Sequence, residues 1–501
     1  MNSILLTDFY KQCHAEQYDP RIRRLVAYYT PRSSRIKGVG RVPVIGVQAF
    51  IKEYLIDHFN ENFFCQPLCE IIGDYEYTIR ETMGDNRVNS EKIANLHNLG
   101  YLPLEIRSLE EGIECPIGVP MIEIVNTHFD FAWVTNVIES LMSCELWYQG
   151  CTAVAGKMYR EIVNKHYDKT SDNCHLKSSA MAEFGMRGLP GLGAAMKASM
   201  GFLMSFNKTS TIPAIKYIRR YYGDDLGVIG RGMASTEHSV MCSSTSIDGD
   251  EISVMKRLLT STYPTGNFSM VCDSYDYWNI IEKVLPKLKS EILGREGTLF
   301  VRGDSGDPVV IVLTTVCRLW ETFRGIINSK GYKVLDSHIR VIYGDGITQL
   351  RAEAIYKGLE KLGFSAENVS LAAGSFSMLC LQEPNSEEDK MILNPYNRDS
   401  FGVAIKTTSG TYIEDAIEGG KMIDIEIFKD PKTDTDNLKK SQKGCCVVYK
   451  SSDEIAYKDG LTLNEAHEDK QNLLIPRFRD GKLMNPTTFT EIRDRLWNGK
   501  F

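Results

Sequence analysis

The sequence has no long apolar run. No stretch approaches the roughly 18 consecutive apolar residues that a membrane-spanning helix needs. The first eleven residues hold only a three-residue apolar run before Asp8 and Lys11, which does not fit a secretory signal peptide. We therefore expect a cytoplasmic protein that does not interact with a membrane.

The sequence also lacks a paired cysteine framework. It has 13 cysteines, an odd number, scattered from Cys13 to Cys446, and none of its nine histidines lies at zinc-ligand spacing from them. This usage is typical of a reducing compartment. Buried free thiols explain the cysteines better than a structural zinc site does.

A surplus of positive charge is missing as well. The formal net charge is −7, from 58 Lys and Arg residues against 65 Asp and Glu residues. This balance argues against nucleic acid as a partner. It leaves room for a small phosphorylated substrate, because a few local arginines can bind one whatever the overall charge.

The 501 residues are too many for one compact core, so two or three structural units are expected. In the first third of the chain, Tyr101–Thr127 is the clearest extended part. Leu104 and Ile106 alternate with charged residues there, and a second extended run begins at Met121. This pattern predicts a small β-containing unit and not a nucleotide site.

The middle of the chain, from about residue 177 to residue 374, repeats strand patterns that end in glycine-rich or acidic loops. Repeated strand–loop–helix units predict a parallel sheet or barrel, whose active site lies at the carboxyl ends of the strands. Val309–Val316 is rich in β-branched residues, but its apolar positions also fit a helical stripe, and we predict a helix. The predicted strands are Phe268–Cys272, Thr298–Val301, Ile339–Tyr343 and Val369–Ala373.

Several of these loops carry residues suited to phosphate chemistry. Arg302 can hold phosphate oxygens through paired hydrogen bonds, and Asp304 can accept from an amide or coordinate Mg²⁺. Gly344-Asp-Gly346 precedes a predicted helix, whose backbone N–H groups can cradle a phosphate. Each loop taken alone is explained as well by turn geometry.

Two further motifs have both a chemical and a structural interpretation. His238, between Glu237 and Ser239, could act as a general base or accept a phosphoryl group, although a histidine satisfied by a neighbour is the simpler reading. Phe184 stands three residues before Arg187 across a glycine, so the ring could stack on a flat substrate while the arginine binds its phosphate. A turn with a packed phenylalanine explains the second motif equally well.

Taken together and in order, the motifs resemble those of the nicotinamide phosphoribosyltransferases. These enzymes belong to the type II phosphoribosyltransferase family and are related to the nicotinate enzymes. The resemblance runs from about residue 4 to beyond residue 444. It rests on Thr7-Asp-Phe-Tyr-Lys11, Phe184-Gly-Met-Arg-Gly188, Glu237-His-Ser239, Asp273-Ser-Tyr-Asp276, Arg302-Gly-Asp-Ser-Gly306, Gly344-Asp-Gly346 and Phe428-Lys-Asp-Pro431.

This resemblance implies an α/β fold: an irregular βα barrel of the type II phosphoribosyltransferase kind, with a β-rich domain built from both chain ends. On this basis residues 1–150 form a mixed α/β part that pairs with the C-terminal segment. Residues 151–400 form the catalytic barrel, and residues 401–501 complete the barrel and the β-rich domain. The resemblance also implies a homodimer whose active sites lie at the subunit interface.

The resemblance further implies roles for individual residues. Tyr10 of one subunit and Phe184 of the other would sandwich the pyridine ring, while Arg187 and Arg302 would bind the diphosphate or phosphate. His238 matches a histidine that such enzymes phosphorylate from ATP, and Mg²⁺ would accompany the diphosphate. Three residues are expected to be catalytic: His238, Arg302 and Asp304. The other positions expected to contact substrate are Ser210, Asp273, Gly303, Gly344, Asp345, Gly374, Ser375 and Arg398.

The chain departs from the family pattern in four places. Met186 replaces an aromatic residue, Ser375 replaces a glycine, and residues 383–397 look like an insertion before Arg398. Ser210 stands where the nicotinamide enzymes usually have an aspartate that accepts from the carboxamide NH₂ and repels nicotinate. A serine can donate to either pyridine, and a Thr-Ser pair at this place resembles the nicotinate enzymes.

We therefore expect an enzyme of NAD salvage that joins nicotinamide to 5-phosphoribosyl-1-diphosphate, giving nicotinamide mononucleotide and diphosphate. ATP and Mg²⁺ are the expected cofactors. Nicotinate phosphoribosyltransferase is the alternative within the enzyme class. A non-catalytic dimeric binding protein of the same fold is the alternative outside it, and the intact His238, Arg187, Arg302 and Asp304 argue against that alternative.

Overall fold

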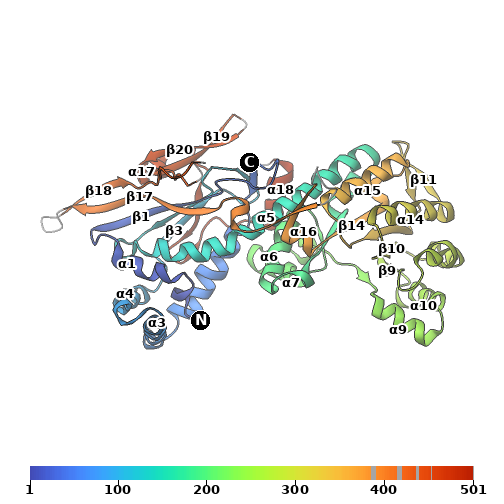
Figure 1. Cartoon of the computed structure of the whole chain (residues 1–501), viewed down its shortest axis with the longest axis horizontal. Coiled ribbons are helices and arrows are strands. Elements are labelled where there is room, and N and C mark those ends of the chain that lie inside the picture. Colours follow the sequence, from blue (N-terminus) through green and yellow to red (C-terminus); the bar gives the residue numbers. More distant parts are fainter. Residues whose placement is uncertain (385–390, 415–419, 436–438, 453, 500–501) are drawn as a thin grey trace. The chain divides into compact units, whose positions relative to one another are not determined.

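The computed structural model describes residues 1–499 except 385–390, 415–419, 436–438 and 453. The chain forms two compact units (Figure 1). Unit 1 comprises Met1–Cys151, Ile218–Asp224 and Tyr396–Phe501, and unit 2 comprises Thr152–Tyr217 and Asp225–Pro395.

Both ends of the chain contribute to an antiparallel sheet in unit 1. Its seven strands have the order β18-β17-β1-β5-β3-β21-β22, and the blue strand β1 lies beside the orange strand β17 in Figure 1. The predicted β-rich region from both chain ends is thereby confirmed. The strands are β1 (Ile22–Thr30), β3 (Leu104–Ser108), β5 (Ile122–Asn126), β17 (Ala404–Glu414), β18 (Lys421–Glu426), β21 (Ile475–Arg479) and β22 (Lys482–Leu483).

The centre of this sheet is fully enclosed. Every residue of β5 is buried, including Glu123. A buried carboxylate needs hydrogen-bond partners, and Glu123 accepts one from the Tyr28 hydroxyl while Nε2 of His467 lies 2.6 Å from it. His467 lies on α17 (Leu463–Glu468), so this contact attaches a C-terminal helix to the sheet.

The other elements of unit 1 lie before and after these strands. The long helix α5 (Val134–Thr170) begins in unit 1 and continues into unit 2. The last helix of the described chain is α18 (Phe489–Asn498), which starts with a capping box at Thr488. The segment 430–443 is rich in Lys, Asp and Thr, a composition that predicts a loop, and it lies partly outside the described residues. The remaining main elements are α3 (Leu68–Met83), α4 (Ser90–Leu99) and the hairpin β19 (Cys445–Ser451) with β20 (Glu454–Leu461).

Unit 2 is built around a parallel sheet. Its seven strands have the order β7-β6-β14-β13-β10-β9-β8, and every pair runs parallel. An isolated parallel bridge between Lys208 and Arg231 also connects β7 to the chain just before β8, at the opposite edge of the sheet. The strands are β6 (Met181–Phe184), β7 (Lys208–Thr209), β8 (Ala234–Ser235), β9 (Phe268–Val271), β10 (Leu299–Gly303), β13 (Ile339–Tyr343) and β14 (Val369–Gly374).

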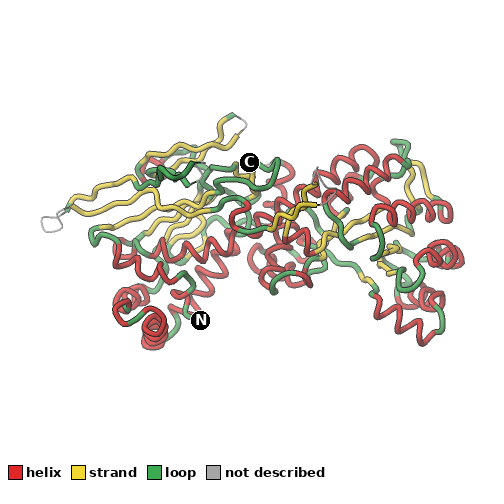
Figure 2. The backbone as a smooth tube through the Cα atoms, in the orientation of Figure 1, coloured by secondary structure: helices red, strands yellow, loops and turns green. Residues whose placement is uncertain are grey.

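Helices surround the strands of unit 2 (Figure 2), as the predicted βα barrel requires. The segment that could have been a strand is the helix α14 (Pro308–Phe323), and the prediction of a helix is confirmed. Asp307 accepts the N–H of Val310 as its N-cap, and Pro308 occupies the first turn, where its fixed φ suits a helix. These helix start signals and the apolar stripe outweigh the preference of the β-branched residues for a strand.

The flanks of the expected insertion form a hairpin, β15 (Cys380–Pro384) with β16 (Met391–Pro395), and residues 385–390 lie outside the described residues.

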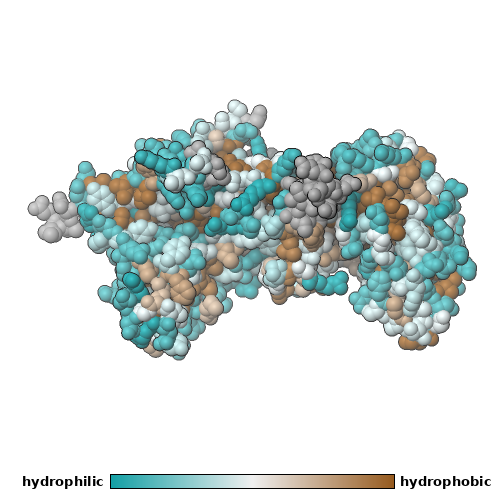
Figure 3. Space-filling model, in the orientation of Figure 1, coloured by the Kyte–Doolittle hydropathy of each residue, from teal (hydrophilic) through white to brown (hydrophobic). Residues whose placement is uncertain are grey.

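Among the described residues, no helix combines the length and the apolar character needed to cross a membrane. Hydrophilic side chains cover most of the face drawn in Figure 3, with hydrophobic ones in smaller patches between them.

Candidate active site

Most of the predicted site residues lie at the carboxyl ends of the parallel strands of unit 2. Loops that follow parallel neighbouring strands lie at one edge of the sheet, so their side chains can act together. Phe184 ends β6, Arg302 and Gly303 end β10, and Gly374 ends β14. The others follow a strand directly or within three residues: Ser210 after β7, His238 after β8, Asp273 after β9, Asp304 after β10, Gly344 and Asp345 after β13, and Ser375 after β14.

Hydrogen bonds join the loops after β9 and β10. Oδ2 of Asp273 accepts from the backbone N–H of Asp304 at 2.9 Å and from the Ser305 hydroxyl at 2.6 Å. Nε of Arg302 lies 3.1 Å from Oδ2 of Asp304, and Nη1 of Arg302 donates to the Ser235 hydroxyl at 2.8 Å. The structure thus brings together three of the predicted residues, Asp273, Arg302 and Asp304.

The charged groups around Asp304 shift the pKa of its carboxyl in opposite directions. Burial raises the pKa of the Asp304 carboxyl above its ordinary value, the Arg302 guanidinium lowers it, and the Asp273 carboxylate raises it further. Perturbed carboxyl groups in charged clefts are common at functional sites. The net upward shift shows that the Arg302 ion pair does not fully offset the burial.

His238 begins α9 (His238–Asp248), with Glu237 in the N-cap position. Nδ1 of His238 lies 3.2 Å from the Ser274 hydroxyl, and Nε2 lies 3.7 Å from Oδ1 of Asp273. The imidazole is about half exposed, at 48 % of its side-chain surface. A solute can therefore reach a ring that the loop after β9 holds in place.

The loops after β6, β13 and β14 adjoin one another. A Cβ atom added to Gly344 would lie 3.1 Å from Cδ2 of Phe184, so the phenyl ring lies against this glycine. A Cβ atom added to Gly188 would overlap the Ser375 side chain. Arg187 lies between Phe184 and Gly188 on a short turn and is exposed.

A cavity of about 250 Å³ lies at the ends of β13 and β14. The thirteen-residue helix α15 (Gln349–Lys361) begins beside it, with Thr348 accepting the N–H of Arg351 at 3.2 Å as its N-cap. Gly346 has a φ of +58°, in the region that favours glycine, and its carbonyl accepts from Nη1 of Arg351. The lining residues are Gly344–Thr348, Arg351 and Gly374–Ser377.

Comparison with known proteins agrees with this arrangement. The nicotinate phosphoribosyltransferase (NAPRTase) family model matches residues 179–458. A protein of Acinetobacter baylyi named nicotinamide phosphoribosyltransferase is 34 % identical over 99 % of this chain and 97 % of its own length. The chain belongs to the nicotinate phosphoribosyltransferase family. A protein of the same name from Xanthomonas campestris pv. campestris is 27 % identical over 98 % of this chain and 97 % of its own length.

Solved structures show that the family fold is present. Nicotinate-nucleotide pyrophosphorylase from Pyrococcus furiosus superposes with a TM-score of 0.56 at 13 % identity, covering 98 % of this chain and 93 % of that one. Human nicotinic acid phosphoribosyltransferase gives a TM-score of 0.54 at 15 % identity with the same coverage of both chains. The expected α/β fold of the type II phosphoribosyltransferase kind is confirmed.

Two predicted residues of this family member belong to unit 1. Tyr10 lies on a 3₁₀ turn, is 57 % exposed, and has the Lys11 ammonium 5.1 Å from its ring centroid. Arg398 begins another 3₁₀ turn and lies 3.6 Å from the carboxylate of Asp399. Their roles in a shared site stay predictions.

Sequence reasoning missed Glu183, which links two loops of the candidate site. Its side chain is fully buried and accepts hydrogen bonds from a residue after β6, from one on α6 (Leu192–Leu203), and from residues on and after β7. The one available signal was a carboxylate directly before Phe184, inside a strand whose other residues are apolar. Nothing in the spacing indicated its partners.

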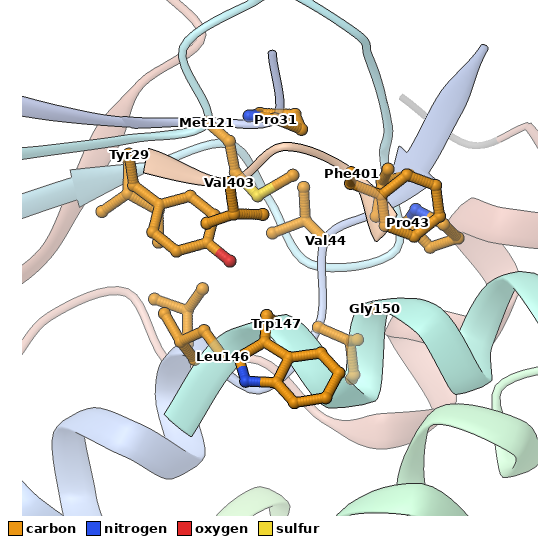
Figure 4. Close-up of a pocket in the computed structure, with 14 residues that line it drawn as sticks. Tyr29, Pro31, Pro43, Val44, Met121, Leu146, Trp147, Gly150, Phe401 and Val403 are labelled. Atoms are coloured by element: carbon orange, nitrogen blue, oxygen red, sulfur yellow. The ribbon is translucent and has the colours of Figure 1, made fainter. Parts of the chain in front are cut away.

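A second cavity, in unit 1, does not suit a substrate. Its volume is only about 20 Å³, and apolar side chains form most of its lining. Figure 4 shows Leu146 and Trp147 of α5 facing Tyr29, Val44 and Val403 across the gap. A space of this size is a packing gap in the core of unit 1.

Proposed function

We propose that the protein is a nicotinamide phosphoribosyltransferase of NAD salvage. It transfers the phosphoribosyl group of 5-phosphoribosyl-1-diphosphate to nicotinamide and releases nicotinamide mononucleotide and diphosphate. The full-length relatives that carry this name support the proposal. The observation that carries it is the arrangement of Asp273, Arg302 and Asp304 at the strand ends of the sheet that also carries the cavity beside α15.

The reaction requires stabilisation of developing charge more than it requires proton transfer. The pyridine nitrogen already has a lone pair and forms the bond to C1 of the ribose, while the bond from C1 to the diphosphate oxygen breaks. Positive charge develops on the ribose and negative charge on the leaving group. Preorganised charges act on such a transition state without reorganising. In this assignment Arg302 and Arg187 face the diphosphate, and Asp304 faces the ribose and the amide.

The cavity beside α15 suits the 5-phosphate of the ribose. A helix N-terminus offers free backbone N–H groups and the positive end of the helix dipole. A Cβ atom added to Gly374 would meet nothing within 4 Å, so the backbone there is open to a close approach, and Arg351 is exposed at the rim. We assign the phosphate of the donor and of the mononucleotide to this cavity.

Mg²⁺ fits the site as a companion of the diphosphate. The described part of the chain has no cluster of three or more His, Cys, Asp or Glu side chains arranged for a metal ion. Mg²⁺, however, is usually held by one or two carboxylates together with substrate phosphates. Oδ1 of Asp273 is buried and accepts no hydrogen bond within the described residues, so Asp273 is the carboxylate that would hold it. The ion would neutralise the charge of the leaving group.

ATP and a second subunit complete the proposal. His238 would accept a phosphoryl group from ATP, and its half-exposed ring beside Asp273 supports this role. Tyr10 and Phe184 would enclose the pyridine ring from two subunits. Large apolar side chains left exposed on the single chain support a homodimer, since a partner would cover them; they include Phe9, Tyr10, Leu192 and Ile212.

The proposal is tested by identifying the product. The chain is incubated with the phosphoribosyl donor, Mg²⁺ and either nicotinamide or nicotinate, with and without ATP, and the nucleotide formed is identified by mass spectrometry. We expect nicotinamide mononucleotide and an equal amount of diphosphate. Product from nicotinate alone would replace the proposal with nicotinate phosphoribosyltransferase. No product from either pyridine, with donor binding retained, would favour a non-catalytic binding protein.

A further inference from the structure

Two separate segments line the cavity beside α15, and one buried side chain of α5 contacts both. Residues 344–348 follow β13, and residues 374–377 lie at the end of β14. The hydroxyl oxygen of Tyr159 lies 2.9 Å from the carbonyl oxygen of Ile347 and 2.8 Å from Oγ of Ser377. Oγ of Ser377 lies 3.1 Å from the same carbonyl oxygen. The three groups form a closed hydrogen-bonded triangle that joins the two segments.

The triangle contains three oxygen atoms and two protons. A carbonyl oxygen can only accept, and each hydroxyl has one proton to donate. The distance between the two hydroxyl oxygens fits a hydrogen bond between them. One hydroxyl therefore donates to the other, which donates to the Ile347 carbonyl, and both protons are used inside the triangle. Tyr159 affects the cavity through Ile347 and Ser377, since it has no proton left to donate to a ligand.

The triangle is shielded from water. Tyr159, Ile347 and Ser377 are all buried, and burial raises the pKa of the Tyr159 phenol, so the hydroxyl keeps its proton at neutral pH. The ring of Tyr159 makes an edge contact with Phe202 of α6, with the centroids 6.2 Å apart. A buried polar group that loses its partner is not rehydrated freely. The contacts of the Tyr159 hydroxyl therefore matter more than those of an exposed one.

The two joined segments contain glycines, which give the backbone more conformational freedom than other residues do. Gly346 directly precedes Ile347, and Gly374 lies three residues before Ser377. A flexible segment that binds a ligand must be ordered at an entropic cost, unless other contacts order it beforehand. The triangle fixes one point on each segment in the absence of a ligand, and so reduces this cost.

We propose that Tyr159 is a positioning residue that holds these two segments at the spacing that the 5-phosphate of the donor requires. The inference rests on the proposed function, which assigns that phosphate to this cavity. Tyr159 does not line the cavity, so it acts by ordering the segments that do. Its effect should therefore appear only with ligands that carry the phosphate, whereas a residue that merely stabilises the fold would not discriminate between ligands.

The first test uses Tyr159→Phe, which removes the hydroxyl and keeps the ring. Loss of one neutral hydrogen bond should raise the KM for 5-phosphoribosyl-1-diphosphate roughly 2- to 12-fold. The KM for nicotinamide and kcat should stay near the parent values. Tyr356→Phe is the matched control, because Tyr356 is also buried, lies on α15, and has a hydroxyl without a hydrogen-bond partner among the described residues. It should leave both KM values unchanged.

A second measurement isolates the 5-phosphate with two inhibitors that differ only in that group. Nicotinamide mononucleotide carries the phosphate, and nicotinamide riboside lacks it. Tyr159→Phe should raise the inhibition constant of the mononucleotide roughly 2- to 12-fold and leave that of the riboside unchanged. Thermal unfolding of the parent and the variant shows whether both are folded at the assay temperature.

The triangle as a unit is tested by a double-mutant cycle of Tyr159→Phe with Ser377→Ala. Each single variant leaves the Ile347 carbonyl one hydroxyl donor, whereas the double variant removes both. We expect the double variant to weaken the mononucleotide more than the product of the two single effects, because residues in one hydrogen-bond network are coupled. Simple multiplication of the two effects would overturn the shared triangle.

The outcomes separate this inference from the proposed function. If the parent makes nicotinamide mononucleotide but Tyr159→Phe weakens the mononucleotide and the riboside equally, or weakens neither, the inference is overturned and the function stands. If the parent makes no mononucleotide, the proposed function fails and the inference fails with it. Ser377→Ala changes a smaller side chain of the same triangle, so it gives the same comparison of inhibitors if Tyr159→Phe does not fold.

Discussion

Nε2 of His238 lies 3.7 Å from Oδ1 of Asp273, and this contact joins the start of α9 to the loop after β9. Oδ2 of the same carboxylate accepts from the backbone N–H of Asp304. Asp273 is 4 % exposed in its side chain, so it orients the imidazole from a buried position. One carboxylate thus connects the residue assigned to ATP with the residues assigned to the ribose and the diphosphate.

His238→Ala should leave basal mononucleotide synthesis detectable but abolish its stimulation by ATP. The assigned role of His238 is to accept a phosphoryl group, which alanine cannot do, whereas the residues assigned to the transfer itself are unchanged. Initial rates with and without ATP measure the effect. His175→Ala, at another exposed histidine, is the control and should keep the full stimulation. Stimulation of the His238 variant equal to that of the parent would rule out this role.

Gly344→Ala should raise the KM for the pyridine. The added Cβ would lie 3.1 Å from the Phe184 ring, so the ring must move from its position at the strand ends. Overpacking of this kind costs about 1 kcal/mol or more, which corresponds to roughly fivefold or more in KM. Gly73→Ala, where an added Cβ meets open space, is the control. An unchanged KM would show that Phe184 does not stack on the substrate.

Mixing two impaired variants should restore activity if the site is shared between subunits. Tyr10→Ala removes the ring expected from one subunit, and Arg187→Ala removes the phosphate ligand expected from the other. A mixed dimer would contain one site with both residues intact. Tyr10→Ala alone should raise the KM for the pyridine far more than that for the donor. If subunit exchange is verified and no activity returns, the interface site is not built from these residues.

The pH dependence of stability should reveal an ion cluster between α5 and α15. Burial alone would raise the pKa of Glu353, but hydrogen bonds from Lys165, His166 and Lys357 hold it at about 2. Because the folded-state pKa lies below the ordinary value of about 4.5, this stabilisation is present above that value and is lost as the pH falls toward 2.

Glu353→Gln tests this cluster through urea unfolding at several pH values. The variant should be less stable than the parent at pH 7 by about 1–3 kcal/mol, and the difference should shrink below pH 4.5. Glu161→Gln removes an exposed ion pair with Lys157 on the same helix and should change stability little. A constant difference between parent and Glu353→Gln across the pH range would contradict the assigned shift.

Local sequence patterns could predict those elements of the fold that such patterns mark directly. The apolar runs with glycine-rich ends predict the buried strands of unit 2, and the helical spacing of apolar residues with the helix start signals predicts α14. The sheet of unit 1 could be placed only through the resemblance, since β1 and β17 come from opposite ends of the chain.

The candidate site was predictable where its residues lie in motifs, as at Arg302, Asp304 and Gly344. The bond from Ser210 to Glu183 was not, because it joins residues 27 positions apart. It depends on the parallel register that places Glu183 opposite Thr209. Local sequence contains no information on that register, so the direction of the Ser210 hydroxyl could be found only in the structure.

The most direct test of the central claim is a competition between the two pyridines in one reaction. Equal concentrations of nicotinamide and nicotinate are mixed with limiting 5-phosphoribosyl-1-diphosphate, Mg²⁺ and ATP, and the two mononucleotides are quantified over time. The ratio of their initial rates equals the ratio of the two kcat/KM values. Nicotinamide mononucleotide is expected to form faster. Faster formation of nicotinate mononucleotide would contradict it.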